Sequence, residues 1–528
     1  MLQTLFNKDC GLLMHPSSLP NHFGIGDFGP STIQWIEQLA AHGQNIWQIL
    51  PLNPAGYGDS PYQGLSAFAA NPAFISPEDL HARGLIEDNE LRALELPLKS
   101  RVDYAQVYAN KLELATRAAL KFFTLDASHP LRQQYDAFLS AESDWLKSFA
   151  LFSALKANFS SVAWTDWPAE YRDRVPEALA RATQELQGDI ARVCFEQFIL
   201  RLQWTAVQKR ARELGVRLVG DLPIFVAHDS ADVWCQRTLF RLNADGSPSV
   251  VAGVPPDYFS STGQLWGNPL YAWDAHRSDH YAWWRNRLRK ILSWVDVVRI
   301  DHFRGFDACW EVPGGASTAA GGKWIPAPGQ EIFDTFVEDH ALPLPVIAED
   351  LGVITPEVEK LRDDYNLPGL RILQFAFGTD PMSGTFLPEN YVANSVAYSG
   401  THDNDTVVGW FASEAGAGST RSAEEIEAER KITLDYFGTD GSEIHWDFIR
   451  SLYRSSAGAT IVPVQDLLGL GSEARMNTPG VASGSWAWRL TDSAALCAAL
   501  EDLYTLARDT ARGLTTAQVA AQVAAQVQ

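Results

Sequence analysis

The chain has 528 residues, of which 46% are hydrophobic and 20% are charged, and its formal net charge is −22. This balance excludes large-scale disorder, and the length predicts several domains or one large domain with insertions, because single cores rarely grow beyond about 250–300 residues. The negative charge would repel nucleic acid over most of the surface, and nowhere do about 18 uncharged apolar residues run together, so we expect neither a nucleic-acid partner nor a membrane span.

Short apolar runs that end abruptly at polar, Gly or Pro residues predict the β-strands. In chain order they are 11–15, 45–50, 216–220, 295–300, 345–348, 370–375, 394–398 and 459–465. Runs without polar alternation are typical of parallel strands that helices cover on both faces. Helical patterns lie between several of them, for example 31–42, which Ser31 could cap, and 282–294. Buried strands separated by helices favour an α/β fold, the (β/α)8 TIM barrel, although their spacing alone does not exclude an open doubly wound sheet.

The interval between the second and third predicted strands breaks this rhythm. It contains strongly helical segments, such as 106–124 and 134–157, and no convincing strand. We expect a large, mainly helical insertion at the C-terminal face of the barrel strands. The predicted parts are 1–75, the first part of the barrel; 76–200, the helical insertion; 201–510, the rest of the barrel with loop insertions; and 511–528, a low-complexity tail.

Four acidic residues stand at or shortly after the ends of predicted strands. They are Asp221, Asp301, Glu349 and Asp403. One acidic residue after a strand is usually a helix N-cap, but this explanation is weaker for all four at once. Because the C-terminal strand ends of a barrel face one way and line a single pocket, we expect these side chains to converge there.

Several carboxylates without other reactive groups favour cleavage of glycosidic bonds. The chain has five cysteines, at 10, 194, 235, 309 and 497, with no CxxC pair, and no metal or cofactor site is predicted. An oxocarbenium-like transition state needs a nearby anion, and the leaving oxygen needs a proton. Arg299 lies two positions before Asp301 and should point to the same side of its strand, keeping that carboxylate ionised. Glu349 follows the apolar sequence PVIA and could retain its proton as a general acid.

Several longer motifs resemble a known family. VRIDHFRGF (298–306), IAEDLGVITPEV (347–358) and GTHDNDTVVGW (400–410) are similar to the three acidic signatures of the α-amylase clan. The segments 47–72, 220–234 and 251–271 resemble more specifically the amylomaltase and plant disproportionating enzyme family, glycoside hydrolase family 77. The resemblance spans about residues 10 to 490. One segment departs from the family pattern, because Ser485 and Ala487 stand in GSWAWRL (484–490) where a more polar run is expected.

The resemblance implies a 4-α-glucanotransferase that moves segments of α-1,4-glucans to the 4-hydroxyl of glucose or maltooligosaccharide acceptors. It assigns Asp301 as the nucleophile, Glu349 as the acid/base and Asp403 as the carboxylate that holds the reacting sugar ring. The 251–271 segment would form an active-site loop whose aromatic residues stack on glucose and keep water out. The substrate-binding residues implied in this way are Tyr62, Asp221, Tyr258, Phe259, Trp266, Arg299, His302 and His402.

The three carboxylates would also serve an α-glucan hydrolase, which is the alternative, or could remain in a glucan-binding protein that has lost activity. The covering loop, and the absence from the sequence of an Asp-rich calcium loop, favour transfer. Two displacements at one carbon predict retention of the α configuration, with the carboxyl groups of Asp301 and Glu349 roughly 5–5.5 Å apart. We further expect a cytoplasmic location, because the N-terminus lacks a basic region followed by a long apolar stretch. The sequence carries no signal of oligomeric state, and a monomer is the default expectation.

Overall fold

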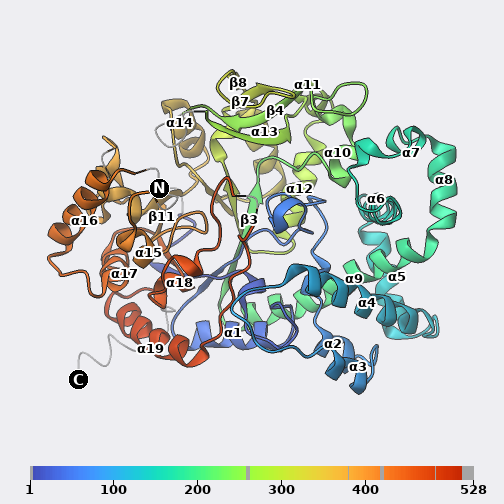
Figure 1. The fold of residues 1–528 in the computed structure, drawn as a ribbon, viewed down its shortest axis with the longest axis horizontal. Helices are drawn as coiled ribbons and strands as arrows, with labels where there is room; N and C mark the ends of the chain where they lie inside the picture. The colour runs from blue at the N-terminus through green and yellow to red at the C-terminus, as the bar shows by residue number, and fades with distance from the viewer. Residues whose placement is uncertain (1–3, 257–261, 379, 417–420, 482, 514–528) are drawn as a thin grey trace.

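A computed structural model describes residues 4–256, 262–378, 380–416, 421–481 and 483–513. Its centre is a closed barrel of eight parallel strands in the order β1-β12-β11-β10-β9-β6-β3-β2 (Figure 1). The predicted (β/α)8 barrel is therefore confirmed, and each predicted strand overlaps one barrel strand. The barrel strands are β1 (Asp9–Leu13), β2 (Ile46–Gln48), β3 (Arg217–Pro223), β6 (Val297–Asp301), β9 (Val346–Ala348), β10 (Gly369–Ile372), β11 (Ser395–Tyr398) and β12 (Ala459–Pro463).

Around the ring, each strand pairs with the strand that follows it in this list, and β12 pairs with β1 to close the barrel. Most of their residues are buried, as expected for parallel strands enclosed by helices. The register places Asp221 of β3 beside Arg299 of β6, and Pro223 beside Asp301. All eight C-terminal strand ends therefore open on the same side of the molecule.

Helices connect the strands around the outside of the barrel. The first begins one residue earlier than predicted, at Pro30, with Gly29 as its N-cap and no side-chain cap. Proline is favourable there because the first helical N–H has no partner within the helix. Outside the long β2–β3 connection, the helices are α1 (Pro30–Ala41), α10 (Ala231–Cys235), α11 (Trp273–Ser278), α12 (Ala282–Leu292), α13 (Gly329–Asp339), α14 (Pro356–Asp364), α15 (Val407–Ala412), α16 (Ala423–Phe437), α17 (Ile444–Arg454), α18 (Val464–Leu467) and α19 (Ser493–Asp509).

The connection between β2 and β3, all of which is described, contains helices and no strand. Most of these helices lie to the right of the barrel in Figure 1. They are α2 (Pro77–Ala82), α3 (Asp88–Ala93), α4 (Tyr104–Phe123), α5 (Pro130–Ala141), α6 (Leu146–Asn158), α7 (Ala169–Arg172), α8 (Pro176–Glu185) and α9 (Gln187–Glu213). Because α9 runs past residue 200 and contacts both α1 and β3, the helical region continues directly into the barrel. The division of the chain at residues 75 and 200 stays a prediction.

A second, antiparallel sheet lies above the barrel in Figure 1 and was not predicted. Its strands, in the order β5-β4-β7-β8, are β4 (Val250–Val254), β5 (Gln264–Pro269), β7 (Ala308–Pro313) and β8 (Lys323–Pro326). The segment 251–271, predicted as a loop, thus contains paired strands at both of its ends. The predicted contact residues Tyr258 and Phe259 lie outside the described residues.

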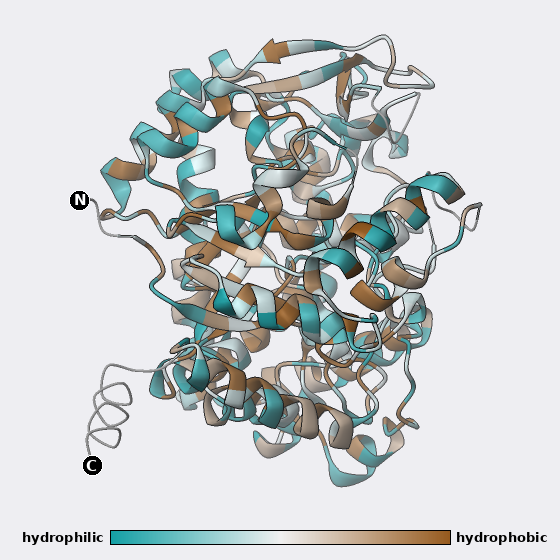
Figure 2. Cartoon of the chain, turned by 90° about the vertical axis from the view of Figure 1, so that its left-hand side faces the viewer, coloured by the Kyte–Doolittle hydropathy of each residue, from teal (hydrophilic) through white to brown (hydrophobic). Residues whose placement is uncertain are grey.

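One hydrophobic cluster extends from the barrel into the helical region, and it includes Trp47 of β2, Phe122 of α4 and Trp204 of α9. In Figure 2 brown, hydrophobic segments are frequent in the middle of the molecule, and the outer helices carry both brown and teal. None of the described helices is long and apolar enough to cross a membrane.

Candidate active site

The four predicted carboxylates come from strands that open at the same end of the barrel. Asp221 lies within β3, Asp301 is the last residue of β6, and Glu349 directly follows β9. Asp403 lies five residues after the end of β11. Parallel strands direct their C-terminal ends to one face, so residues distant in sequence meet at the mouth of the barrel.

A buried arginine connects two of these carboxylates. Arg299 Nη1 donates to Oδ1 and Oδ2 of Asp221 at 2.9 and 2.7 Å, and Nη2 donates to Asp301 Oδ1 at 2.9 Å. Burial would lower the pKa of Arg299, but the charges of Asp221 and Asp301 outweigh it and hold that pKa well above its usual value. The Asp221 side chain is fully buried, whereas that of Asp301 is 29% exposed. Asp301 is therefore oriented by a fixed cation and remains accessible to a ligand.

In contrast to Asp301, which is bonded to a cation, Glu349 lies in surroundings that favour its protonated form. Burial raises its pKa well above the usual value, and the negative charge of Asp301 raises it further, although Arg299 acts in the other direction. Its Oε2 accepts the backbone N–H of His302 at 2.8 Å, and its Oε1 accepts that of Leu351 at 3.1 Å. His302 adopts a left-handed backbone conformation, with φ of 52°. The site thus contains one carboxyl group that tends to keep its proton beside one held by a cation.

The loop after β11 contributes a second charged pair. His402 Nε2 lies 3.3 Å from Asp403 Oδ2, and Asn477 Nδ2 donates to Asp403 Oδ1 at 2.6 Å. Burial would raise the pKa of Asp403, but His402 and the Asn477 hydrogen bond hold it below its usual range. Burial likewise opposes the charging of His402, yet Asp403 raises the pKa of its imidazole. Asp403 is therefore an anion, and its side chain is 44% exposed.

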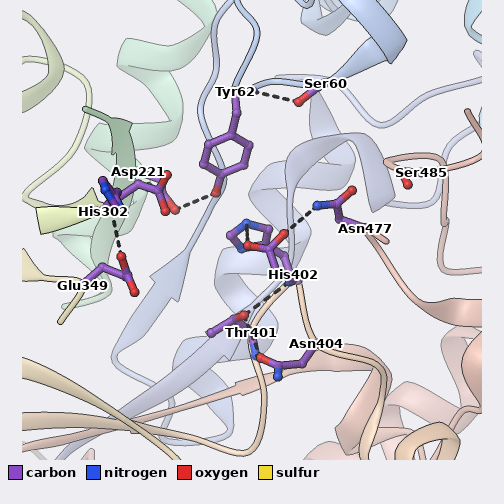
Figure 3. A network of polar contacts seen from close by, with 12 residues as sticks. Ser60, Tyr62, Asp221, His302, Glu349, Thr401, His402, Asn404, Asn477 and Ser485 are labelled. Carbon is purple, nitrogen blue, oxygen red and sulfur yellow. Dashed lines mark hydrogen bonds and ion pairs between the residues drawn. The ribbon is translucent and has the colours of Figure 1, made fainter. Parts of the chain in front are cut away.

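Tyr62 connects the two halves of the site (Figure 3). Its hydroxyl donates to Asp221 Oδ2 at 2.9 Å, and its ring stacks on that of His402 with centroids 5.0 Å apart. Ser60 Oγ accepts the backbone N–H of Tyr62 at 3.3 Å. The loop after β2 is thereby anchored to groups on β3 and after β11.

The small sheet contacts one side of the site through its strand β5. Trp266 of β5 meets the ring of His302 edge to face, with centroids 4.8 Å apart. Burial lowers the pKa of His302 to about 4, so its imidazole is neutral near pH 7. The structure describes nine of the eleven sequence-predicted site residues and brings all nine together at the barrel mouth. They are joined by hydrogen bonds, an ion pair and ring contacts, and by the direct chain link between Asp301 and His302: Tyr62, Asp221, Trp266, Arg299, Asp301, His302, Glu349, His402 and Asp403.

Comparison with known proteins shows which family the chain belongs to. A family model described as 4-alpha-glucanotransferase, glycoside hydrolase family 77, matches residues 14–495. The chain belongs to this family. The 4-alpha-glucanotransferase of Synechocystis sp. is 45% identical over 489 residues, which are 92% of this chain and 94% of that protein. The enzyme of Thermus thermophilus is 46% identical over 486 residues, covering 91% of this chain and 94% of that one.

A solved amylomaltase structure has the same fold. The amylomaltase from Streptococcus agalactiae, in complex with acarbose, superposes with a TM-score of 0.90 at 34% identity. The match covers 96% of this chain and 100% of that one. Amylomaltase architecture therefore extends over nearly the whole molecule, helical region and small sheet included.

The sequence of this glucanotransferase family member did not indicate two features of the site. Asn477, which holds Asp403, lies in a segment without regular structure, and no sequence pattern marks it. Trp486 approaches the ring of Tyr62, with centroids 5.6 Å apart, from the segment that departs from the family pattern. In that segment Ser485 Oγ accepts the N–H of Thr478 at 3.2 Å. Among the residues that the structure describes, no group of three or more His, Cys, Asp or Glu side chains could hold a metal ion.

Proposed function

We propose that this chain is a retaining 4-α-glucanotransferase that transfers a segment of an α-1,4-glucan to the 4-hydroxyl of glucose or a maltooligosaccharide. Family membership over residues 14–495 supports the activity. The observation that carries the mechanism is the contrast between two carboxyl groups, namely Asp301, which is accessible and bonded to Arg299, and Glu349, whose pKa burial raises.

In the first half of the reaction, a carboxylate oxygen of Asp301 attacks the anomeric carbon of the donor as the bond to the leaving oxygen breaks. Glu349 gives its proton to the leaving glycosidic oxygen, and the shortened glucan leaves with a free 4-hydroxyl. The remaining segment is then an ester of Asp301. In the second half, the ionised Glu349 takes the proton of an acceptor 4-hydroxyl, which attacks the anomeric carbon and releases Asp301. Two inversions at one carbon retain the α configuration.

The other groups would bind the reacting sugar. Asp403 is an exposed anion next to His402, and such a pair can hold two ring hydroxyls of the distorted sugar by charge-assisted hydrogen bonds. Arg299 and His302 are placed beside Asp301 and Glu349, respectively. Tyr62 and Asp221 are proposed to complete the donor site.

Transfer rather than hydrolysis requires that water be kept from the ester until an acceptor arrives. Trp266, which packs against His302 at the barrel mouth, supports this assignment because it places an apolar ring beside the site. The monomeric state and the cytoplasmic location stay predictions.

Incubation with maltotriose tests the proposal. We expect glucose and a ladder of longer maltooligosaccharides without a net increase in reducing ends, and loss of both products in Asp301→Ala. Mass spectrometry of Glu349→Gln stalled with an activated α-glucosyl donor should find the sugar on Asp301. A steady rise in reducing ends would instead support the hydrolase, and unchanged turnover of Asp301→Ala would remove the assigned nucleophile.

A further inference from the structure

The loop that carries His402 and Asp403 is held at both ends by one buried carboxylate. Asp466 lies on α18, just after β12, and is only 2% exposed. Its Oδ2 accepts the hydroxyl of Ser399 at 2.6 Å, and its Oδ1 accepts the backbone N–H of Val407 at 2.7 Å. Ser399 directly follows β11 and Val407 begins α15, so these two residues bracket the loop.

The space beneath this loop is incompletely packed. A cavity of about 30 Å³ lies there, lined by His402, Thr406, Asp466 and Arg475 and by residues at and just after the end of β1, among them Leu13 and Met14. It is large enough for at least one water molecule. The loop is therefore incompletely packed against the barrel at this point, and hydrogen bonds contribute to its position.

Other hydrogen bonds act within the loop, on its middle or near one of its ends. Asn404 Oδ1 accepts the N–H of Thr401 at 2.8 Å, which closes a local turn, and Arg475 Nη2 donates to the carbonyl oxygen of Asp403 at 2.7 Å. Neither contact joins the two ends of the loop. Asp466 does so, and it connects them to the neighbouring barrel strand β12. Gln374, just after β10, also contacts the loop near both ends, because its backbone N–H donates to Ser399 O at 3.3 Å and its Nε2 donates to Asp405 O at 2.8 Å. Of these two residues, only Asp466 binds the first residue of α15.

We propose that Asp466 is a positioning residue for the transfer reaction. It holds the loop so that His402 and Asp403 can contact the reacting sugar. The inference rests on the proposed role of Asp403. An aspartate at this place is more than a helix cap, because the same side chain restrains both the exit from β11 and the start of α15. Displacement of a catalytic group by about 1 Å can reduce the rate about 100-fold.

The test compares Asp466→Ala with Asp466→Asn. Asn can accept the Val407 N–H through its oxygen and donate to Ser399 through its amide, so both contacts are kept with one of them reversed. We expect Asp466→Ala to lower kcat on maltotriose by about 100-fold with a change in KM below about 3-fold, and Asp466→Asn to restore kcat to within about 5-fold of the original chain.

Asp296→Ala is the matched control. Asp296 Oδ2 also accepts a backbone N–H, that of Leu218 at 2.9 Å, but at the N-terminal end of the barrel. This control should leave kcat unchanged. Thermal unfolding of each variant establishes that it is folded. If Asp466→Ala does not fold, Ser399→Ala, which removes one of the two contacts, should still lower kcat about 10-fold.

Asp403→Asn separates the inference from the function on which it rests. It should abolish transfer if the proposed function is right, and full activity would overturn that function. With Asp403→Asn inactive, unchanged kcat in folded Asp466→Ala or in Ser399→Ala would overturn the positioning role alone. An equal loss of kcat in Asp466→Asn and Asp466→Ala would also overturn the positioning role. The loss would then not depend on the hydrogen bonds to Ser399 and Val407, which Asn keeps.

Discussion

At the scale of single residues, the site depends on one guanidinium shared between two carboxylates. Arg299 is buried, and its fork fits Asp221 with one nitrogen and Asp301 with the other. Burial raises the pKa of Asp221 to about 6, despite the attraction of Arg299. A lysine could not hold both partners in one plane, because its ammonium group is a point charge without a fixed fork. The geometry of Asp301 therefore depends on an arginine at position 299.

The first prediction concerns the proton on Glu349. A general acid must be protonated, so kcat falls as pH rises through its pKa, and burial of Glu349 shifts that fall toward or above neutral pH. Glu349→Gln should lower kcat by about 10²–10⁴-fold and leave a residual rate that no longer falls with pH. The measurement is the pH profile of glucose release from maltotriose between roughly pH 5 and 9.

Glu311→Gln is the control for this profile. Glu311 is a buried glutamate of β7, in the small sheet, where it pairs with Arg241. Its neutralisation should leave both kcat and the alkaline fall in place. If the alkaline fall persists in Glu349→Gln, another group supplies the proton.

At the scale of elements, the barrel strands could be predicted because each is a short, mainly apolar run in which most residues are buried. The strand VVRID, for example, has four buried residues followed by the half-buried Asp301. The small sheet could not be predicted in the same way. In β5 the first four residues are exposed or half-buried, and in β8 none is buried, so neither has a continuous apolar run nor a clear period of two.

Most of the site residues could also be predicted from the sequence, but Asp466 and Asn477 were not. An acidic residue after a barrel strand was the signal that identified Asp301 and Glu349. Asp466 carries that signal too, because it directly follows the predicted strand 459–465, but it was not recognised. Asn477 could not be found at all, since its contact with Asp403 depends on how a segment without regular structure folds back over the barrel.

The second prediction concerns the strand β5. Trp266 is expected to keep water from the ester of Asp301, so Trp266→Ala should raise the ratio of hydrolysis to transfer by roughly 3- to 10-fold. The ratio is measured as new reducing ends per glucose released from maltotriose. Trp310→Ala, on β7 of the same sheet, removes an equally large ring whose indole N–H bonds Ala319 O at 2.9 Å, and should leave the ratio unchanged. An unchanged ratio in Trp266→Ala would show that water is excluded by other groups.

At the scale of the whole molecule, the helical region and the barrel share one core. Trp204 of α9 lies 6.1 Å from Trp47 of β2 between ring centroids, and its indole N–H donates to the carbonyl of Trp294 at 2.6 Å. Phe122 of α4 approaches Phe198 of α9, with centroids 6.0 Å apart. Because the apolar contacts run without interruption from α4 to the barrel, we expect the two parts to unfold together.

The third prediction uses a buried ion pair that joins them. Lys111 of α4 donates to Ile75 O at 2.5 Å and lies 3.4 Å from Asp27 Oδ2, with both side chains almost completely buried. Lys111→Met leaves Asp27 without its cation and should lower the free energy of unfolding by about 3–5 kcal/mol. Lys121→Met, on the same helix, breaks only a partly exposed ion pair with Glu87. It should change the free energy of unfolding by less than about 1 kcal/mol.

The shape of the Lys111→Met transition distinguishes a shared core from two independent domains. If the core is shared, far-ultraviolet circular dichroism and tryptophan fluorescence should shift together to a lower Tm, and the calorimetric and van't Hoff enthalpies should agree. The connection between β2 and β3 carries Trp145, Trp164, Trp167 and Trp204, whereas β2 carries Trp47. An early transition followed by a second one at the original Tm would mean that the helical region unfolds alone, as an insertion that is only attached to the barrel.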